Sequence, residues 1–450
     1  MKQYLHKIFD SNTFKGATLN LLIGQGLLTL LFLLFDFVIA RKFTVEIFST
    51  WKQLQILINL ILPIVAFGLP EGYKYFIAYE PEKSKLHHTS MIGYLLLLTV
   101  FVALISVLFG RAILQVYFHN PLLNNVAKVF ALLFCSITIN RVLRYQLVNE
   151  HKTDVYLKGT VVAIFIAILS LIGIAFFHLQ IHTKNIILIF AIIVSIVFLI
   201  PSLLNFLLTK HLNFEIDFTL QRLIDYLKIG FPLYLATFMS LIISNLDKTI
   251  VSKYTTLSMF GIYAAGALEI PIFSMLSASF SQSTFPKYVA LLKENRKQQA
   301  IQLWILITNK VSKITYPILL ILMIFAKTIF VLIYSTKLIA AVPIFKIFLL
   351  ICLWRNNYYG SLISASGKTK WITFYSLLNL IIMGLGCWFC FRLFGFKSLP
   401  WVIFSSTSFV AIAQLAHEKM LKDFVLKFLF QPQNLLLIIL IIAAFIFSPF

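Results

Sequence analysis

The chain has 450 residues, of which 60% are hydrophobic and only 12% are charged, and its net charge is +22. A soluble domain carries about 25% charged residues because its surface must face water. A single oversized soluble core is also excluded, because such cores stop growing at roughly 250–300 residues. The composition therefore indicates an integral membrane protein.

Spanning helices need about 20 mostly apolar residues. Thirteen runs meet this length, and they lack the period-two alternation of barrel strands, so an all-α fold is predicted. The predicted spans are residues 16–40, 51–69, 89–110, 125–147, 157–178, 185–208, 229–252, 261–285, 306–334, 341–364, 371–392, 399–416 and 433–449, of which the last is an extra C-terminal helix.

Lysine and arginine gather in short connectors between these runs, which is typical of the positive-inside rule and not of a nucleic-acid-binding face. Anionic phospholipids are therefore expected partners, and nucleic acid is not. The richer set of connectors is predicted to be cytoplasmic; it comprises the N-terminus and residues 70–88, 148–158, 209–228, 286–313, 365–370 and 417–432.

Reactive residues form no recognisable catalytic or metal-binding pattern. HExxH, GxSxG and P-loop motifs are absent, so neither an enzyme nor a cofactor is expected. All four cysteines lie in apolar runs, and no disulfide is predicted, although Cys387 and Cys390 form a CxxC. His87 and His88 lie in a predicted cytoplasmic connector and are expected to be exposed.

The chain contains a weak parallel repeat. The segment from Asp36 to Thr44 resembles that from Asp247 to Thr255, and Phe48–Trp51 then aligns with Phe260–Tyr263. A second match links residues 149–153 to 366–369, again six spans later. Transporters often consist of such repeats, with the substrate path between them. Two bundles are therefore predicted, at residues 1–210 and 211–420, followed by the extra helix at 421–450.

Several short motifs resemble those of one transporter family, in the same order along the chain. They are Gly68–Ala78 after the second span, Asn245–Val251 in the seventh, Phe260–Ala265 after it, Phe285–Lys287 at the end of the eighth, and Ser364–Thr369. The chain thus resembles the oligosaccharide (polysaccharide repeat-unit) flippase branch of the multidrug/oligosaccharidyl-lipid/polysaccharide exporters. That family has twelve core helices, whereas thirteen runs occur here.

The resemblance implies a V-shaped transporter with a central cavity and alternating access. It would move a polyprenyl-pyrophosphate-linked oligosaccharide from the cytoplasmic to the periplasmic leaflet of the bacterial inner membrane. The product would serve O-antigen, capsule or exopolysaccharide synthesis, with a polysaccharide polymerase and chain-length machinery as further partners.

Charged residues at membrane depth cost about 2.5–3.5 kcal/mol or more, so each is a functional candidate. Arg141 and Arg144 lie one turn apart with Tyr145 beside them, and are predicted to bind the pyrophosphate. The alternative is snorkelling to headgroups. Lys15 and Lys74 are further candidate cations, although Lys15 also fits an ordinary basic flank and Lys74 also fits a simple pair with Glu71.

Gating or ion coupling is predicted for five acidic or neighbouring basic residues: Asp36, Glu71, Asp247, Lys248 and Glu269. Asp247 and Lys248 point about 100° apart on a helix, which favours pairing between helices over a joint pocket. Glu269 precedes Pro271 and fits proton or cation binding, or a buried carboxylate paired with a Lys or Tyr.

Arg355, Asn356 and Asn357 form the most polar patch inside any span and are predicted to line the cavity.

Two other functions remain open at this point. One is a cation-coupled multidrug antiporter of the same superfamily, which usually has fewer cavity cations because its substrates are often cationic. The other is a membrane polysaccharide polymerase or glycosyltransferase, which typically needs a sizeable extramembrane loop; no connector here is that long.

Overall fold

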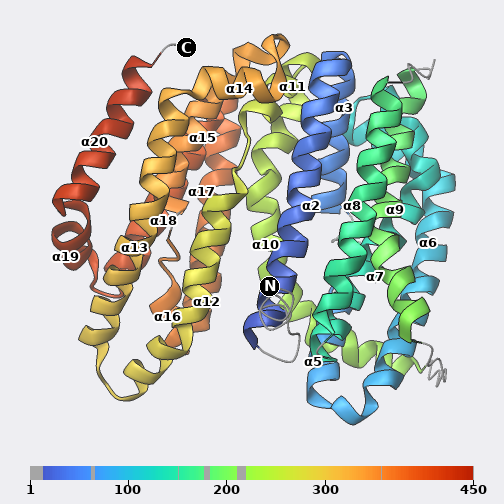
Figure 1. The fold of residues 1–450 in the computed structure, drawn as a ribbon, viewed down its shortest axis with the longest axis horizontal. Coiled ribbons are helices and arrows are strands. Elements are labelled where there is room, and N and C mark those ends of the chain that lie inside the picture. The colour runs from blue at the N-terminus through green and yellow to red at the C-terminus, as the bar shows by residue number, and fades with distance from the viewer. Residues whose placement is uncertain are drawn as a thin grey trace, which may run out of the picture. The chain divides into compact units, whose positions relative to one another are not determined.

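The computed structural model describes residues 14–61, 66–150, 152–176, 183–209, 219–355 and 357–448. Within these ranges the chain forms helices and no strands (Figure 1). In the described part of the chain, nine helices are long and apolar enough to cross a membrane, or ten if one bent pair counts as a single span. The all-α, multi-pass class predicted from the sequence is confirmed.

The chain divides into two compact units, residues 1–241 and 242–450, and the division falls inside α10 (Leu220–Tyr254). The predicted bundles at 1–210 and 211–420 stay a prediction. The first unit contains α2 (Phe14–Lys42), α3 (Val45–Ile56) and its π-helical continuation (Leu57–Ile61), α5 (Leu69–Tyr79), α6 (Ser84–Phe118), a 3-10 helix (Pro121–Val129), α7 (Phe130–Asn149), α8 (Thr153–Phe176), α9 (Thr183–Thr209) and the first part of α10.

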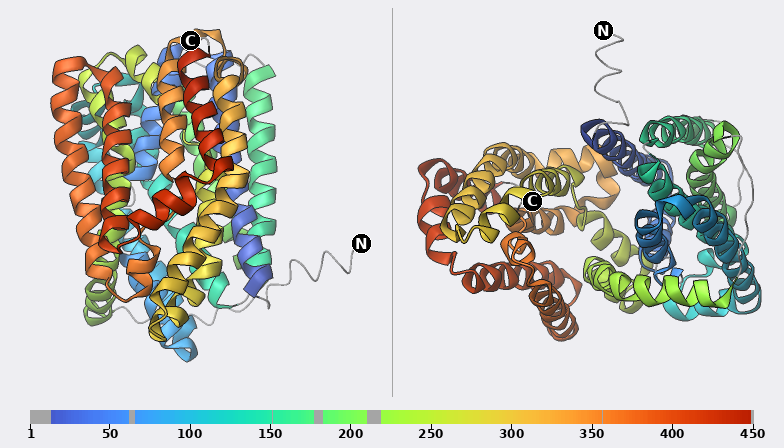
Figure 2. Two further views of the ribbon diagram at one scale, coloured as in Figure 1. Left: turned by 90° about the vertical axis from the view of Figure 1, so that its left-hand side faces the viewer. Right: turned by 90° about the horizontal axis from the view of Figure 1, so that it is seen from below.

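The second unit begins in α10 and ends near the C-terminus (Figure 2). Its helices are α11 (Leu257–Gly266), α12 (Pro271–Lys293), α13 (Lys297–Ile324), α14 (Ala326–Tyr334), a 3-10 helix (Thr336–Ala341), α15 (Val342–Arg355), α16 (Ser361–Ala365), α17 (Thr369–Phe394), α18 (Leu399–His417), α19 (Leu421–Phe424), a π-helix (Val425–Leu429) and α20 (Pro432–Phe447).

Four of the predicted continuous spans are interrupted. The run at 51–69 breaks before α5, where Phe67 and Gly68 have φ of 50° and 84°. The run at 261–285 breaks between α11 and α12, just before Pro271, whose fixed φ suits the first turn of a helix. The runs at 306–334 and 341–364 are likewise divided, after Ile324 and after Arg355. Hydropathy alone does not report such breaks, because apolar residues continue across them.

The internal repeat is visible in matching contacts. Thr44 and Thr256 occupy the N-cap positions of α3 and α11, both with extended backbone. In the first unit Trp51 Nε1 donates to Asp36 Oδ1 at 2.8 Å, and in the second Tyr263 donates its hydroxyl proton to Asp247 Oδ2 at 2.7 Å. Aligned aspartates thus accept from aligned aromatic residues, as a parallel repeat requires.

The predicted extra helix corresponds to α20. A bend of 83° separates it from the helical segment Leu421–Leu429, so the pair forms either a broken span or a re-entrant element. Figure 2 shows this segment crossing the second unit obliquely before α20 turns along the neighbouring helices.

Candidate functional site

A cluster of charges in the first unit surrounds Tyr145, which lies on α7. At a rise of about 1.5 Å per residue, Arg141 lies about 12 Å and Arg144 about 8 Å inside the end of this helix. Both are half-buried. Residues at i and i+3 or i+4 share one helical face, which is why these two arginines and Tyr145 meet.

Glu71 anchors one side of this cluster. It is buried in the first turn of α5, and its Oε1 lies 2.6 Å from Arg141 Nη2. The position of α5 depends on Gly68 and Gly72, because a Cβ on Gly72 would lie 2.1 Å from the carbonyl oxygen of Tyr226 on α10. A simple Glu71–Lys74 pair, which the sequence allowed, is not observed among the described contacts.

Tyr145 contacts all three cations of the cluster. Arg141 Nε donates to its hydroxyl at 3.4 Å, while Lys74 Nζ and Arg144 Cζ lie 5.4 Å and 5.9 Å from its ring centroid. These distances fit cation–π contacts. We call Glu71, Lys74, Arg141, Arg144 and Tyr145 the Tyr145 cluster.

The Tyr145 cluster has a positive balance: three cations against one carboxylate leave a formal charge of +2. Within the described part of the chain, Lys74 and Arg144 have no carboxylate partner. Tyr234 on α10 lies close to the Glu71–Arg141 pair, and its hydroxyl is buried without a hydrogen-bond partner among the described residues. The cluster can therefore accept an anion.

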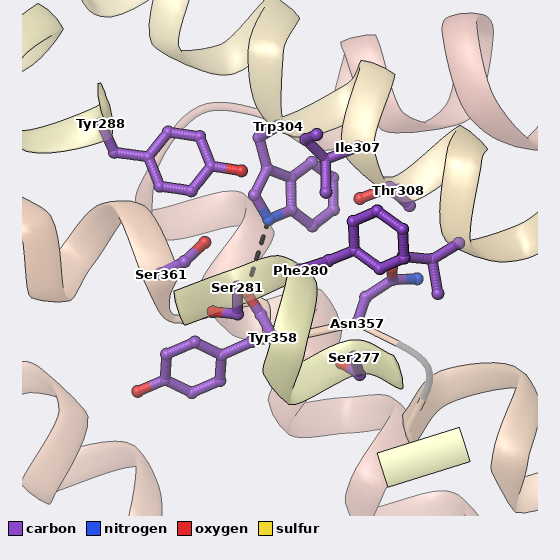
Figure 3. Close-up of a pocket in the computed structure, with 11 residues that line it drawn as sticks. Ser277, Phe280, Ser281, Tyr288, Trp304, Ile307, Thr308, Asn357, Tyr358 and Ser361 are labelled. Atoms are coloured by element: carbon purple, nitrogen blue, oxygen red, sulfur yellow. Dashed lines mark hydrogen bonds between the residues drawn. The ribbon is translucent and has the colours of Figure 1, made fainter. Parts of the chain in front are cut away.

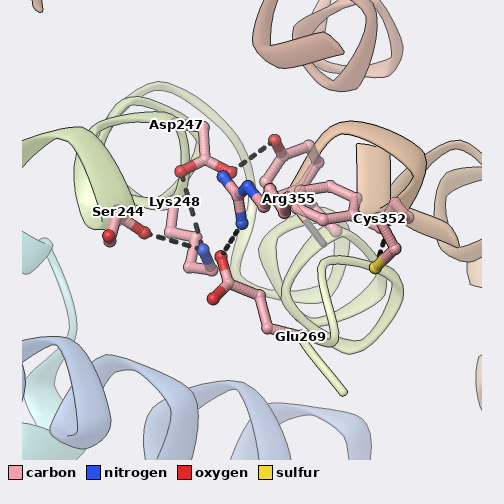
Figure 4. A network of polar contacts seen from close by, with 8 residues as sticks. Ser244, Asp247, Lys248, Glu269, Cys352 and Arg355 are labelled. Carbon is pink, nitrogen blue, oxygen red and sulfur yellow. Dashed lines mark hydrogen bonds and ion pairs between the residues drawn. The ribbon is translucent and has the colours of Figure 1, made fainter. Parts of the chain in front are cut away.

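A second charged group lies in the second unit and is balanced (Figure 4). Arg355 Nη1 lies 2.6 Å from Glu269 Oε1, and Lys248 Nζ lies 3.7 Å from Asp247 Oδ1. Lys248 also donates to the carbonyl oxygen of Ser244 at 2.9 Å. Two acids and two bases cancel, so this group attracts an added anion less than the Tyr145 cluster does. The Glu269 side chain is half-exposed and its partner is an arginine. The alternative considered from the sequence, a buried carboxylate paired with a Lys or Tyr, is therefore not what the structure has.

Asp36 is enclosed within its own unit. It is buried, forms an ion pair with Lys52, and accepts from Trp51 and from Gln55 at 3.1 Å. These partners all come from α3. Sequence reasoning missed them, although the aligned aromatic positions of the repeat gave a signal for Trp51.

Asn357 lines a small cavity with several hydroxyl groups (Figure 3). Ser281, Thr308 and Ser361 contribute to its wall, and Trp304 Nε1 donates to the carbonyl oxygen of Tyr358 at 3.4 Å. The space open to the centre of a water molecule is about 20 Å³. That holds about one water and no sugar ring. Asn356 and the side chain of Lys15 lie outside the described part of the chain.

The expected exposure of His87 is wrong. His87 is buried, with its Nδ1 2.8 Å from the Tyr226 hydroxyl and its Nε2 3.3 Å from Glu80 Oε2. Hydrogen bonds from Lys83 and from His87 lower the pKa of Glu80. The sequence-based prediction failed because α6 begins at Ser84 and carries His87 against α10.

Two solved structures that are described as transporters have a similar fold. A multidrug resistance MATE family transporter of the MOP superfamily, in an inward-facing conformation, matches with a TM-score of 0.63 at 16% identity, over 87% of this chain and 94% of its own. A MOP superfamily transporter from Pyrococcus furiosus matches with a TM-score of 0.55 at 12% identity, over 90% and 94%. The chain therefore shares the fold of these two solved structures.

The sequence identifies the family within that fold. Residues 20–343 match the family described as polysaccharide biosynthesis protein. The match covers more than half of the chain, so the protein belongs to this family, and the resemblance seen in its motifs is confirmed. The search of curated proteins found no match.

Proposed function

We propose that the protein is a flippase for polyprenyl-pyrophosphate-linked oligosaccharides. It carries them by alternating access from the cytoplasmic to the periplasmic leaflet of the bacterial inner membrane, for synthesis of O-antigen, capsule or exopolysaccharide. Its N-terminus is cytoplasmic in this proposal, and a polysaccharide polymerase and chain-length machinery receive the product. Membership of the polysaccharide biosynthesis family and the transporter fold support this function.

The observation that carries the proposal is the positive balance of the Tyr145 cluster within a membrane-spanning bundle. A pyrophosphate is an anion with several oxygen acceptors, and arginine can bind two of them at once through its planar fork. Lys74 and Arg144 are the cations that lack carboxylate partners among the described residues. In this mechanism they bind the pyrophosphate, while Arg141 is shared between it and Glu71.

Glu71 then competes with the substrate for Arg141. When the site is empty, Glu71 compensates Arg141 and limits the cost of an unpaired charge at this depth. When the pyrophosphate leaves on the other side, the carboxylate recovers its partner. Such competition speeds release, because the empty site is not left with three uncompensated cations. The balanced group containing Arg355 and Glu269 is the candidate for gating, together with Asp247 and Lys248.

A multidrug antiporter remains the competing function, since one structural neighbour is a multidrug resistance transporter. The charge of the Tyr145 cluster disfavours it, because a site with an excess of two positive charges repels a cationic drug.

Complementation tests the proposal directly. The protein is expressed in a strain that makes a compatible glycan but lacks its own repeat-unit flippase. It should restore surface polysaccharide and remove the lipid-linked units that accumulate at the cytoplasmic face. Its presence in the membrane is verified by immunoblot. Accumulation that persists despite normal insertion, together with efflux of a cationic dye, would favour the antiporter.

A further inference from the structure

A groove on the second unit collects basic and amide side chains away from both charged groups described above. It is lined by Gln302, Ile305, Leu306, Asn309, Lys310 and Lys313 from α13, and by Lys427 and Gln431 from the segment around the bend before α20. The α13 residues recur every three or four positions and so form one face. The space open to a water centre is about 420 Å³, within the range of small-ligand sites.

The groove lies at membrane depth. Lys310 is thirteen residues after Lys297 and fourteen before Ile324, the two ends of α13, so about 20 Å of helix extends on either side of it. Because the hydrocarbon core is about 30 Å thick, Lys310 cannot lie outside it without displacing half of the helix into water. Charges at such a depth normally mark a functional site.

The basic side chains here exceed the acidic ones. Lys427 Nζ lies 2.7 Å from Asp423 Oδ1, whereas Lys310 and Lys313 are exposed and in no ion pair with a described residue. Three lysines against one aspartate leave an excess of two positive charges. The wall also carries amide groups from Gln302, Asn309 and Gln431, which can donate further hydrogen bonds.

Apolar side chains border the same groove. Leu306 lines the groove and is 47% exposed. Leu426 precedes Lys427 in the chain and is 57% exposed, and Phe430 precedes Gln431 and is 59% exposed. The bend that brings Lys427 and Gln431 to α13 interrupts the helix at this depth, and such interruptions are tolerated where the backbone lines a polar cavity. The groove thus joins a cationic polar floor to an apolar rim.

We propose that this groove binds one anionic phospholipid, with its phosphate at Lys310, Lys313 and Lys427 and its acyl chains along the apolar rim. The charge complementarity selects a phosphate, and the rim selects a lipid over a soluble anion. Because the site lies between α13 and the C-terminal helices, the bound lipid would attach those helices to the rest of the unit.

Lipid binding to the purified full-length protein tests the site. Phosphatidylglycerol is titrated by native mass spectrometry, with phosphatidylcholine and inorganic phosphate as separate probes. The variant carries Lys310→Gln, Lys313→Gln and Lys427→Gln. Each basic side chain near a lipid phosphate is worth about fivefold in affinity, so this variant should bind phosphatidylglycerol roughly 100-fold more weakly. A variant with arginine at the same three positions should retain binding.

The matched control removes three exposed lysines from the same unit by Lys287→Gln, Lys293→Gln and Lys368→Gln. It loses the same net charge, and its affinity should stay within about threefold of the wild type, since screened surface charges act weakly. Equal losses in the two triple variants would overturn the proposal in favour of a general basic surface. Equal affinity for phosphatidylcholine, or displacement of the lipid by inorganic phosphate at similar concentrations, would also overturn it. If the groove variant is too unstable to purify, the Lys313→Gln single variant decides, with an expected loss of about fivefold; unchanged affinity there overturns the site.

Discussion

Tyr145 is neutral, yet three cations contact it. Its ring faces Lys74 and Arg144, and its hydroxyl accepts from Arg141. Each cation–π contact contributes about 0.5–1 kcal/mol at a partly exposed site, which reduces the repulsion among the cations without neutralising them. An anion can therefore still bind there with net attraction.

Replacing the arginines separates phosphate binding from headgroup snorkelling. We expect Arg141→Lys and Arg144→Lys each to give a partial defect, because lysine keeps the charge but loses the fork. A lost charge-assisted contact costs about 1.5–3 kcal/mol, which weakens binding roughly 10- to 150-fold, so the double alanine variant should abolish export. Export in vivo, normalised to protein in the membrane, measures this. Full activity in both lysine variants would favour snorkelling and remove the arginines from the site.

Glu71→Gln tests the competition for Arg141. Without the carboxylate, the pyrophosphate should bind several-fold more tightly, since it no longer competes with an ion pair at 2.6 Å. Export should nevertheless slow, because release is hindered. Affinity is measured with a short-chain polyprenyl pyrophosphate on the purified protein. Glu82→Gln, at an exposed position in the α5–α6 connector, is the control. Weaker binding in Glu71→Gln would mean that Glu71 holds Arg141 in place for the substrate.

At the scale of elements, close contact between α5 and α10 sets where Glu71 lies. A Cβ on Gly230 would lie 2.2 Å from the carbonyl oxygen of Gly68, whose φ of 84° itself favours glycine. Gly68 and Gly72 are four residues apart, which is the small-residue spacing that lets membrane helices approach closely.

We therefore expect Gly230→Ala to separate these helices and to destabilise the first unit by about 1–3 kcal/mol. Its thermal unfolding midpoint in detergent should fall, and export should fall with it. Gly173→Ala on α8 is the matched control, because nothing lies within 4 Å of its added Cβ. A Gly230→Ala protein as stable as the Gly173→Ala protein would contradict the close contact.

Helices that depend mainly on local sequence could be predicted, and features that depend on distant residues could not. Apolar runs gave the long helices α6, α8 and α9, and the aligned Asp36 and Asp247 gave the repeat. The break at Gly68 and the partner of Glu71 were not predictable, because both depend on residues far away in the chain. Arg141 is 70 positions from Glu71, and no periodicity links them.

At the scale of the whole molecule, orientation is the next quantity to measure. The basic residues from Lys287 to Arg296, the part of the predicted connector 286–313 that precedes α13, should face the cytoplasm, because the positive-inside rule sets orientation through such segments. In a chain whose four cysteines are replaced by alanine, a cysteine at Lys293 should react with an impermeant maleimide only after the membrane is permeabilised. A cysteine at the exposed Lys397, in a predicted outer connector, should react in intact cells. The reverse pattern would invert the predicted topology.

The charge of the molecule was predictable in amount but not in distribution. Composition gives the net charge of +22, and the basic connectors give a prediction of the side of the membrane that carries most of it. Tertiary contacts decide which cations at membrane depth have acidic partners. From the sequence alone, Arg355 and Arg144 were therefore equally good candidates for binding the substrate. In the structure Glu269 pairs with Arg355, whereas Arg144 has no carboxylate among the described residues.

The paired contacts of Asp36 with Trp51 and of Asp247 with Tyr263 have a historical consequence. One hydrogen bond kept at the same place in both units, by different aromatic residues, indicates an ancestral gene that was duplicated and fused. The ancestral protein would then have worked as two identical copies, each with the same polar lining. The two halves have since diverged around these aspartates: Asp36 now forms an ion pair with Lys52 from α3, whereas Asp247 lies beside Lys248 on its own helix, in the balanced group that contains Arg355.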